Sequence, residues 1–283
     1  MTRWPNLFVV GASRSGTTSL WHYLGGHPEI YMSPLKEPHY FSKLRPPYLR
    51  TVSTEADYLA LFAGARGERF VGEATPVYLH VDGAAAAIIE ASPDARAIAV
   101  LREPVSRLYS DYWHAVRYGR EQRSVEEALI EPVATPADLP STKLFRRSFY
   151  AGPVRTFKEA FGEHLLVLWY DDLVRDVRGF VLQILEFLGV DPTYAATFDT
   201  TPRNETGLPR SRTVSMLYRS RRIRDVGSRL IPDSLQARVE SLLLSRQSVP
   251  ELDPSLRRTL EPVFAEDRAE LEALLGRAAP WGR

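Results

Sequence analysis

Four short apolar runs, each followed by a segment with helical periodicity, constrain the fold of this chain more than any other feature. The runs cover residues 6–10, 69–72, 95–101 and 164–170. Apolar residues recur at helical spacing over residues 17–26, 54–62, 81–91, 104–118, 149–161 and 177–188. Strands that are apolar throughout and alternate with amphipathic helices are typical of a parallel sheet covered on both faces. The sequence therefore predicts an α/β fold, with a central parallel sheet flanked by helices.

The C-terminal third lacks a strand pattern. Asp253 and Pro254 form a good helix start, as N-cap and first helical residue. An apolar stripe then runs toward Gly276, through Leu256, Leu260, Phe264, Leu271 and Leu274. We expect this part to be helical and to cover the same core. Because no linker or repeat interrupts the chain, residues 1–283 are expected to form a single domain.

Charge and cysteine content exclude several classes of protein. The 36 basic and 35 acidic residues leave a net charge of +1, so no global field attracts nucleic acid or an anionic membrane. No apolar window is long enough to span a bilayer, so stable membrane insertion is not expected. The absence of cysteine excludes disulfides, thiolate metal sites and a cysteine nucleophile, and a cytoplasmic location is the expectation. The six histidines show no metal-ligand spacing, so no metal is expected.

The most informative segment lies between the first predicted strand and the first predicted helix. It reads Gly11-Ala-Ser-Arg-Ser-Gly-Thr-Thr-Ser19. Glycines let the backbone N–H groups turn inward, and a helix N-terminus adds a positive dipole, so the segment predicts a site for a phosphate or sulfate. Its spacing is P-loop-like, but Thr17 stands where a nucleotide triphosphatase carries lysine, and the cation is Arg14 instead.

Four motifs in order carry a resemblance to a known family. They are residues 11–19, Lys36-Glu-Pro-His-Tyr-Phe41, Glu73-Ala-Thr-Pro76 and Leu101-Arg-Glu-Pro104 with Ser110-Asp-Tyr112. Together they resemble the PAPS-dependent sulfotransferases, specifically the bacterial relatives of the heparan-sulfate enzymes. PAPS is 3′-phosphoadenosine 5′-phosphosulfate. The resemblance covers residues 6–190, and the C-terminal helices look similar too.

The resemblance implies how the co-substrate is held. The first loop would bind the 5′-phosphosulfate through Arg14, Ser15, Gly16, Thr17, Thr18 and Ser19. Arg14 replaces the lysine usual in the family. Arginine keeps the charge but does not donate from a single point, as an ammonium does. Arg102 and Ser110 match the family's pair for the 3′-phosphate, and Arg102 also stands at the end of a predicted strand, where α/β sheets bind ligands.

The same resemblance implies a base for the acceptor's proton. Glu37 occupies the family's glutamate position, and His39 is the alternative. We expect neighbouring aromatic residues to desolvate Glu37 and raise its pKa, while Lys36 pulls the pKa of Glu37 down. Arg14 would stabilise the leaving phosphate. Ala74 stands where some heparan-sulfate enzymes have a second lysine, so Lys36 or a basic residue elsewhere is expected to substitute, unless the acceptor needs less compensation.

Two further residues are carried over from the family. Tyr150 follows Arg146-Arg-Ser-Phe149 in a segment where relatives often have an Arg-x-x-Tyr start to a helix lining the cleft, so it is either a cleft residue or a half-buried aromatic. Arg210 belongs to an arginine-rich segment that in the family folds over the nucleotide.

The implied reaction is in-line transfer of a sulfuryl group from PAPS to an acceptor hydroxyl, on a saccharide, a lipid alcohol or a secondary metabolite, releasing 3′,5′-ADP without a metal. One alternative is a P-loop kinase or NTPase that uses Asp171 and Asp172 as its Walker B acids, against which the missing lysine argues. Another is a non-catalytic nucleotide-binding module.

Overall fold

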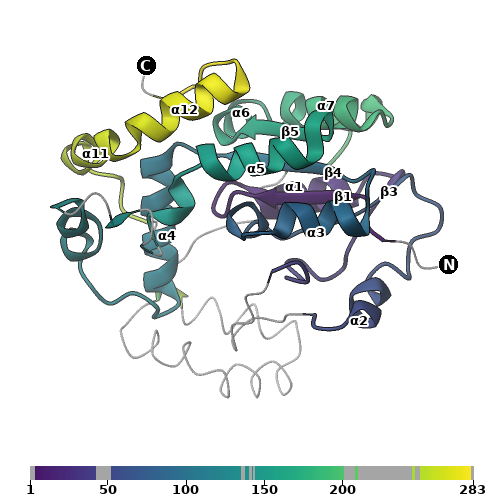
Figure 1. Cartoon of the computed structure of the whole chain (residues 1–283), viewed down its shortest axis with the longest axis horizontal. Coiled ribbons are helices and arrows are strands. Elements are labelled where there is room, and N and C mark those ends of the chain that lie inside the picture. The colour runs from purple at the N-terminus through teal and green to yellow at the C-terminus, as the bar shows by residue number, and fades with distance from the viewer. Residues whose placement is uncertain are drawn as a thin grey trace.

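Five parallel strands form the central sheet of the computed structural model, in the order β2-β3-β1-β4-β5 (Figure 1). The structure describes residues 4–42, 52–134, 138–139, 142, 144–200, 208–209, 244–245 and 249–281. The strands are β1 (Leu7–Gly11), β2 (Ile30–Met32), β3 (Phe70–Ala74), β4 (Arg96–Leu101) and β5 (Leu165–Trp169). β1 lies at the centre and pairs with both β3 and β4. The predicted α/β fold with a central parallel sheet is confirmed.

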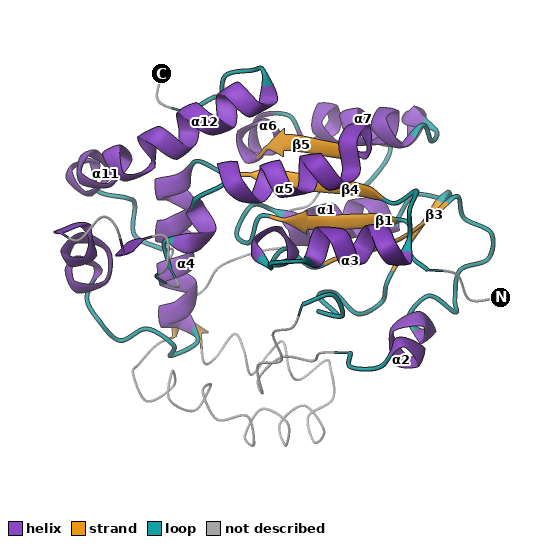
Figure 2. Ribbon diagram, in the orientation of Figure 1, coloured by secondary structure: helices purple, strands orange, loops and turns teal. Residues whose placement is uncertain are grey.

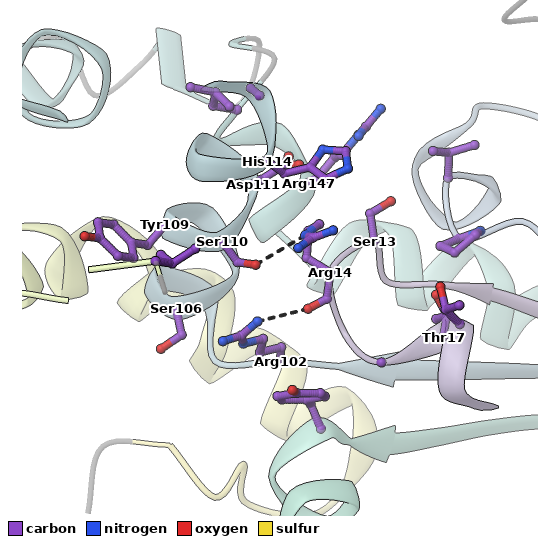
Figure 3. Close-up of a pocket in the computed structure, with 18 of the residues that line it drawn as sticks. Ser13, Arg14, Thr17, Arg102, Ser106, Tyr109, Ser110, Asp111, His114 and Arg147 are labelled. Carbon is purple, nitrogen blue, oxygen red and sulfur yellow. Dashed lines mark hydrogen bonds between the residues drawn. The ribbon is translucent and has the colours of Figure 1, made fainter. Parts of the chain in front are cut away.

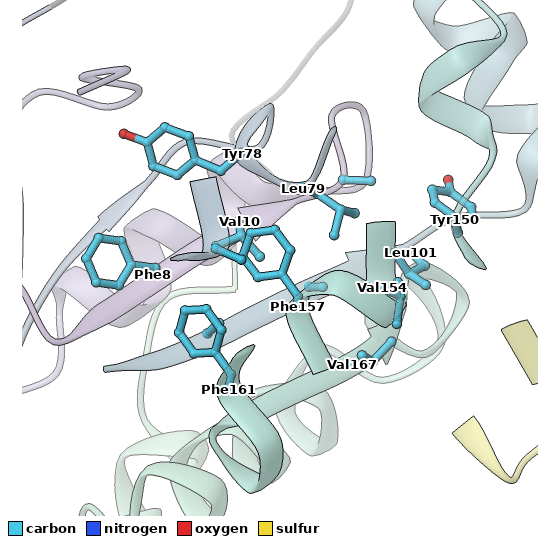
Figure 4. Close-up of a cluster of buried hydrophobic side chains, with 14 of the residues drawn as sticks. Phe8, Val10, Tyr78, Leu79, Leu101, Tyr150, Val154, Phe157, Phe161 and Val167 are labelled. Atoms are coloured by element: carbon cyan, nitrogen blue, oxygen red, sulfur yellow. The ribbon is translucent and has the colours of Figure 1, made fainter. Parts of the chain in front are cut away.

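Both faces of the sheet are buried, which explains why its strands are apolar throughout. Side chains alternate along β1, so that Phe8 and Val10 belong to one core cluster and Leu7 and Val9 to the other. Figure 4 shows the first cluster, in which Phe8 and Val10 lie near Phe157 and Phe161. Every residue of β1 is buried, as the continuous apolar run predicts.

Helices cover the two faces of the sheet. On one face α1 (Thr17–Gly25) and α7 (Val177–Leu188) contribute Leu20 and Ile184 to the core. The other face is covered by α3 (Ala84–Ala91), α5 (Ala151–Phe161) and α12 (Ala265–Leu275) (Figure 2). These helices contribute Ile88, Phe157 and Leu271 to the core. The predicted helices on residues 17–26, 81–91, 149–161 and 177–188 are therefore present and flank the sheet. Besides α4 (Pro104–Arg117), the other helical elements that the structure describes on the first 200 residues are α2 (Glu55–Ala60), η1 (Tyr78–His80), η2 (Glu126–Ile130), η3 (Glu131–Ala134), η5 (Arg146–Ser148), η6 (Gly162–His164), α6 (Tyr170–Arg175) and η7 (Pro192–Ala196).

Helix α4 (Pro104–Arg117) stands at the carboxyl edge of the sheet, and the strand arrows in Figure 2 point toward it. Glu103 caps its start by accepting hydrogen bonds from the backbone N–H groups of Val105 and Ser106. A third core cluster, which includes Leu108 and Leu260, packs α4 against α11 (Pro254–Leu260). This packing fixes α4 as a wall across the edge where the strands end.

Three features depart from the sequence expectations. β2 is only three residues long, too short for its apolar character to stand out, and it was not predicted. Two further short strands, β6 (Leu208–Pro209) and β7 (Leu244–Ser245), pair antiparallel, so the expectation that the C-terminal third contains no strand is wrong. Pro262 lies in η8 (Glu261–Phe264), between α11 and α12, so the C-terminal stripe is divided among three elements.

The single-domain assignment stays a prediction.

Among the described residues, no helix has both the length and the apolar character that crossing a bilayer requires.

Candidate functional site

A cleft of about 1790 Å³ opens at the carboxyl edge of the sheet. β2 and β3 lie on one side of β1, and β4 and β5 lie on the other side, so the strand order reverses between β1 and β4. Parallel sheets usually bind ligands at the carboxyl ends of the two strands that flank such a reversal. Nine of the predicted site residues line the cleft: Arg14, Gly16, Thr17, Thr18, Ser19, Glu37, His39, Arg102 and Ser110. The fold thus brings together residues that are far apart in the sequence.

The loop between β1 and α1 has the geometry of an anion site. Gly16 adopts φ +77°, and a Cβ there would lie 2.5 Å from Leu173 Cδ2, so only glycine fits. Gly16 is also the N-cap of α1 and supplies no side-chain cap, which leaves the first N–H groups of the helix for a ligand. Ser15 is fully buried, does not line the cleft, and its hydroxyl has no hydrogen-bond partner within the described part of the chain.

Arg14 and Arg102 meet at this loop (Figure 3). Arg14 Nε donates a hydrogen bond to Ser110 Oγ at 3.2 Å, and Arg102 donates to the carbonyl of Arg14 at 3.1 Å. The Arg102 guanidinium also lies over the Tyr170 ring, 4.8 Å from its centroid. Burial lowers the pKa of Arg14, and the charge of Arg102 lowers it further, while Asp111 opposes this. Two guanidinium groups this close are stabilised by a bound anion.

Asp111 organises a second group of charges on α4. Its carboxylate accepts a hydrogen bond from the buried Arg107 at 3.2 Å. Burial would raise the pKa of Asp111, but Arg107 and Arg147 outweigh it and hold the pKa below its usual value. In Figure 3, Arg14 lies between Arg102 on one side and the group of Asp111, His114 and Arg147 on the other. The cleft therefore has cations along its length.

Arg147 lines the cleft and was not singled out as a site residue from the sequence. Its guanidinium makes no hydrogen bond or ion pair with any residue that the structure describes. Burial lowers the pKa of Arg147, whereas Asp111 and Glu37 raise it, so it lies within electrostatic reach of both. The adjacent Arg146 is different, because it is paired with Asp82 at 3.6 Å. The sequence alone could not show which of these two neighbouring arginines is already paired.

Glu37 lies in the segment that follows β2. Lys36 Nζ is 2.5 Å from Glu37 Oε1, and His39 Nε2 is 3.5 Å from Glu37 Oε2. Burial would raise the pKa of Glu37, but His39 and Lys36 together lower it to about 2. The expected rise in its pKa is therefore wrong, because two neighbours stabilise the carboxylate more than burial destabilises it.

Glu37 and His39 both have left-handed backbone conformations, with φ of +60° and +59°. Arg14 does too, with φ +72°. Such conformations cost free energy in residues other than glycine, and they cluster at functional sites. His39 is buried, and neither of its ring nitrogens has a hydrogen-bond partner among the described residues.

Tyr150 does not line the cleft. It is fully buried, and its hydroxyl donates a 2.9 Å hydrogen bond to the carbonyl of Arg102. Of the two roles expected for Tyr150, the structure favours the buried aromatic, which supports Arg102 from behind. Arg210 lies outside the described residues.

A sequence model of the Sulfotransferase family matches residues 47–194, more than half of the chain. The chain belongs to the sulfotransferase family. This confirms the resemblance seen in the four motifs.

Individual relatives agree with the assignment to the sulfotransferase family. A sulfotransferase from Alicyclobacillus acidocaldarius is 31% identical, with a TM-score of 0.71 over 98% of this chain and 97% of that one. Mouse heparan sulfate glucosamine 3-O-sulfotransferase 6 is 29% identical over 189 residues, 66% of this chain and 53% of the relative. The membrane-associated sulfotransferase kil1 of Dictyostelium discoideum is 31% identical over 120 residues, 42% of this chain and 25% of the relative. The chain thus matches only a quarter to about half of these curated relatives.

The alternative of a Walker-type NTPase finds little support in the structure of this chain. Asp171 accepts a hydrogen bond from Trp281 Nε1 at 3.1 Å, and Asp172 pairs with Arg175. Neither aspartate lines the cleft. Both expected acids are therefore engaged elsewhere. Among the described residues, no group of three histidine, aspartate or glutamate side chains is arranged to hold a metal ion; the expectation of metal-free chemistry stays a prediction.

Proposed function

We propose that this member of the sulfotransferase family transfers a sulfuryl group from PAPS to an acceptor hydroxyl and releases 3′,5′-ADP (PAP). The observation that carries the proposal is the single cleft that contains the anion loop, the Arg102–Ser110 pair and the Glu37 carboxylate. An anion site alone would fit many nucleotide-binding proteins. A carboxylate in the same cleft adds the base that transfer to a hydroxyl requires.

The residues present fit such a co-substrate. The uncapped start of α1, with Thr17 and Thr18 in its first turn, would hold the 5′-phosphosulfate. Arg102 and Ser110 would hold the 3′-phosphate. Arg14 lies between these two groups and would neutralise charge on the departing 5′-phosphate. PAPS supplies an anhydride whose sulfuryl group is the only part transferred.

Glu37 is the proposed base, and Lys36 regulates its strength. With a pKa of about 2, Glu37 is ionised at neutral pH but is a weak base. The Lys36 ammonium has three N–H donors and uses one on Glu37. An anionic group bound in the cleft competes with Glu37 for the Lys36 ammonium. The weaker interaction with Lys36 then raises the pKa of Glu37, which makes Glu37 a stronger base. Lys36 would thereby provide the second cation that Ala74 does not. His39, 3.5 Å from Glu37, is the alternative base.

Arg147 supports an acceptor that carries a negative charge near its reacting hydroxyl. A guanidinium that has no partner among the described residues and lies within electrostatic reach of Glu37 would orient a carboxylate or sulfate through bidentate hydrogen bonds. The names of the curated relatives refer to heparan sulfate and to carbohydrate, which supports a saccharide over a lipid alcohol or a secondary metabolite. We propose a cytoplasmic location on the absence of cysteine.

The test is a transfer assay with PAPS labelled in its sulfuryl group, offered to saccharide, lipid-alcohol and phenol panels in the presence of EDTA. We expect label on an acidic saccharide and stoichiometric PAP. Binding of PAP without transfer to any acceptor would favour the non-catalytic module. ATP turnover that depends on Mg²⁺ would favour the kinase or NTPase. The Glu37→Gln variant serves as the inactive control.

A further inference from the structure

A second carboxylate, Glu73, is completely buried behind the segment that bears Glu37. It belongs to β3 and does not line the cleft. Three hydroxyl groups donate to it. Tyr58 reaches Oε1 at 2.6 Å, Tyr78 reaches Oε1 at 3.0 Å, and Thr75 reaches Oε2. Burying a carboxylate costs free energy unless hydrogen-bond donors surround it, and three hydroxyls surround Glu73. A residue type this costly to bury suggests a functional role.

The hydroxyl groups connect Glu73 to the segment 36–42. The backbone N–H of Phe41 donates to the Tyr78 hydroxyl at 3.2 Å. The ring of Tyr40 stacks on that of Tyr58, with centroids 4.2 Å apart and planes at 10°. At its other end, the segment is held by the N–H of Glu37, which donates to the carbonyl of Ala74 at 3.0 Å. Both tyrosines bound to Glu73 thus contact residues immediately after His39.

The segment needs such support because its conformation is strained. Left-handed backbone at both Glu37 and His39 costs free energy at each residue, so surrounding contacts must hold it. The contacts from Phe41 to Tyr78 and from Tyr40 to Tyr58 provide this restraint only while the tyrosines are themselves fixed. Glu73 fixes both, since its Oε1 accepts from each hydroxyl.

The groups that face Glu73 are Tyr58 from α2, Tyr78 from η1, Thr75 after β3, and His39 from the segment itself. Burial raises the pKa of Glu73 to about 7, although the three hydroxyl bonds and the charge of His39 lower it. Burial likewise raises the pKa of Tyr58 and of Tyr78, which keeps both as donors. The ionised carboxylate accepts from all three hydroxyls, whereas a protonated carboxyl donates from one oxygen and forces at least one of the three bonds to rearrange.

We propose that Glu73 is a positioning residue for the transfer reaction: as a carboxylate it fixes Tyr58 and Tyr78, and through them it holds the segment 36–42 in the conformation that presents the base. The inference rests on the proposed function, in which the base lies on this segment. Glu73 itself touches no substrate.

The decisive experiment compares the pH dependence of kcat in the wild type and Glu73→Gln. In the wild type, protonation of Glu73 below about pH 7 removes one hydroxyl bond, so kcat should fall about tenfold between pH 8 and pH 6 as the base loses its placement. The pH profile of Glu73→Gln separates the two carboxylates, because a fall caused by Glu37 would persist in that variant. Glu73→Gln should have the low kcat at both pH values, with PAP affinity by calorimetry unchanged. A Glu73→Gln enzyme that keeps the wild-type kcat, or the wild-type fall, overturns the inference.

Two tyrosine variants test the same inference if Glu73→Gln does not fold. Tyr78→Phe removes the acceptor for Phe41 N–H and should lower kcat about tenfold with KM for PAPS unchanged. Tyr58→Phe keeps the stack on Tyr40 and removes only one bond to Glu73, so its loss should be smaller. Tyr31→Phe is the control, because its hydroxyl donates to the Leu61 carbonyl outside this network. Equal kcat in Tyr78→Phe and Tyr31→Phe would refute the connection.

The two ideas can fail separately. If Glu37→Gln is inactive while Glu73→Gln matches the wild type, Glu37 remains the base and Glu73 has no positioning role. If Glu37→Gln is active while Glu73→Gln loses turnover with the predicted flat pH profile, Glu73 remains a positioning residue and His39 is the base.

Discussion

Arg14 and Ser110 are joined across the cleft by a 3.2 Å hydrogen bond from Nε to Oγ. Arg14 follows β1 and Ser110 lies on α4, so the bond connects the two sides of the proposed PAPS site. The structure thereby couples a residue expected at the 5′ end of the nucleotide to one expected at the 3′ end.

Ser110→Ala should weaken PAP binding about tenfold. The variant removes one hydrogen bond to a charged group, which is worth roughly 1.5–3 kcal/mol, of which the lower part applies at a solvated cleft. Calorimetric titration with PAP measures the change. Unchanged affinity would mean that Ser110 serves only to orient Arg14.

Arg102→Ala should weaken PAP and PAPS alike, and more than Ser110→Ala does. It removes a full charge from the end of β4 and also frees the carbonyl of Arg14. Arg155→Ala is the matched control, since Arg155 is exposed and pairs with Glu270. The assignment to the 3′-phosphate fails if calorimetry gives wild-type affinity for both nucleotides.

Glu37→Gln should lower turnover about 10²-fold or more while PAP affinity stays within error, because a general base typically contributes 10²–10⁴-fold. Steady-state transfer assays and calorimetry give the two values. The control is Glu121→Gln, which removes a cleft-lining carboxylate that is paired with Arg123 instead. Near-normal turnover in Glu37→Gln would transfer the role to His39.

Arg147→Gln should raise KM for an acidic acceptor about tenfold and leave KM for PAPS unchanged, since the guanidinium is expected to bind the acceptor's anion. Arg146→Gln removes the same charge from the neighbouring position, where the side chain is already paired with Asp82, and should have a smaller effect. An unchanged KM for the acidic acceptor in Arg147→Gln would mean that Arg147 does not bind the acceptor.

The stability of the protein should fall as the pH is lowered from about 6.5. Burial and the charge of Arg107 lower the pKa of His80 to about 3, whereas in an unfolded chain a histidine titrates near 6.5. Between these values the unfolded chain binds more protons, so the free energy of unfolding decreases with decreasing pH. Urea midpoints at pH 7.5 and pH 5 measure the loss. His80→Gln keeps a donor for the Phe149 carbonyl and should reduce the loss; a variant with the wild-type loss would contradict this source of the effect.

Local patterns were sufficient for the fold class. The apolar runs at residues 6–10 and 95–101 became β1 and β4, because strands buried on both faces must be apolar at every position. β2 could not be predicted in this way, since three residues give no usable period.

The site was only partly predictable. Arg14, Arg102 and Glu37 could be named from motifs, and they line one cleft. The position of Tyr150, whose hydroxyl donates to the Arg102 carbonyl, could not be predicted from its motif. A tyrosine before a helix can equally well face the cleft or be buried in the core. The pKa of Glu37 was expected to rise and instead falls, since left-handed backbone at Glu37 and His39 brings the imidazole to 3.5 Å from the carboxylate.

The sequence by itself determined the fold class and the family and predicted the anion loop, because these depend on local periodicity and on motifs of fixed spacing. Only the tertiary structure decided which charges act together. Arg146 and Arg147 are neighbours in sequence, yet one is paired with Asp82 and the other is left without a partner among the described residues. Glu73 is one of many glutamates in the sequence, and only the packing of α2, β3 and η1 surrounds it with three hydroxyls. Electrostatic roles depend on distance and burial, which are set by contacts between segments far apart in the chain.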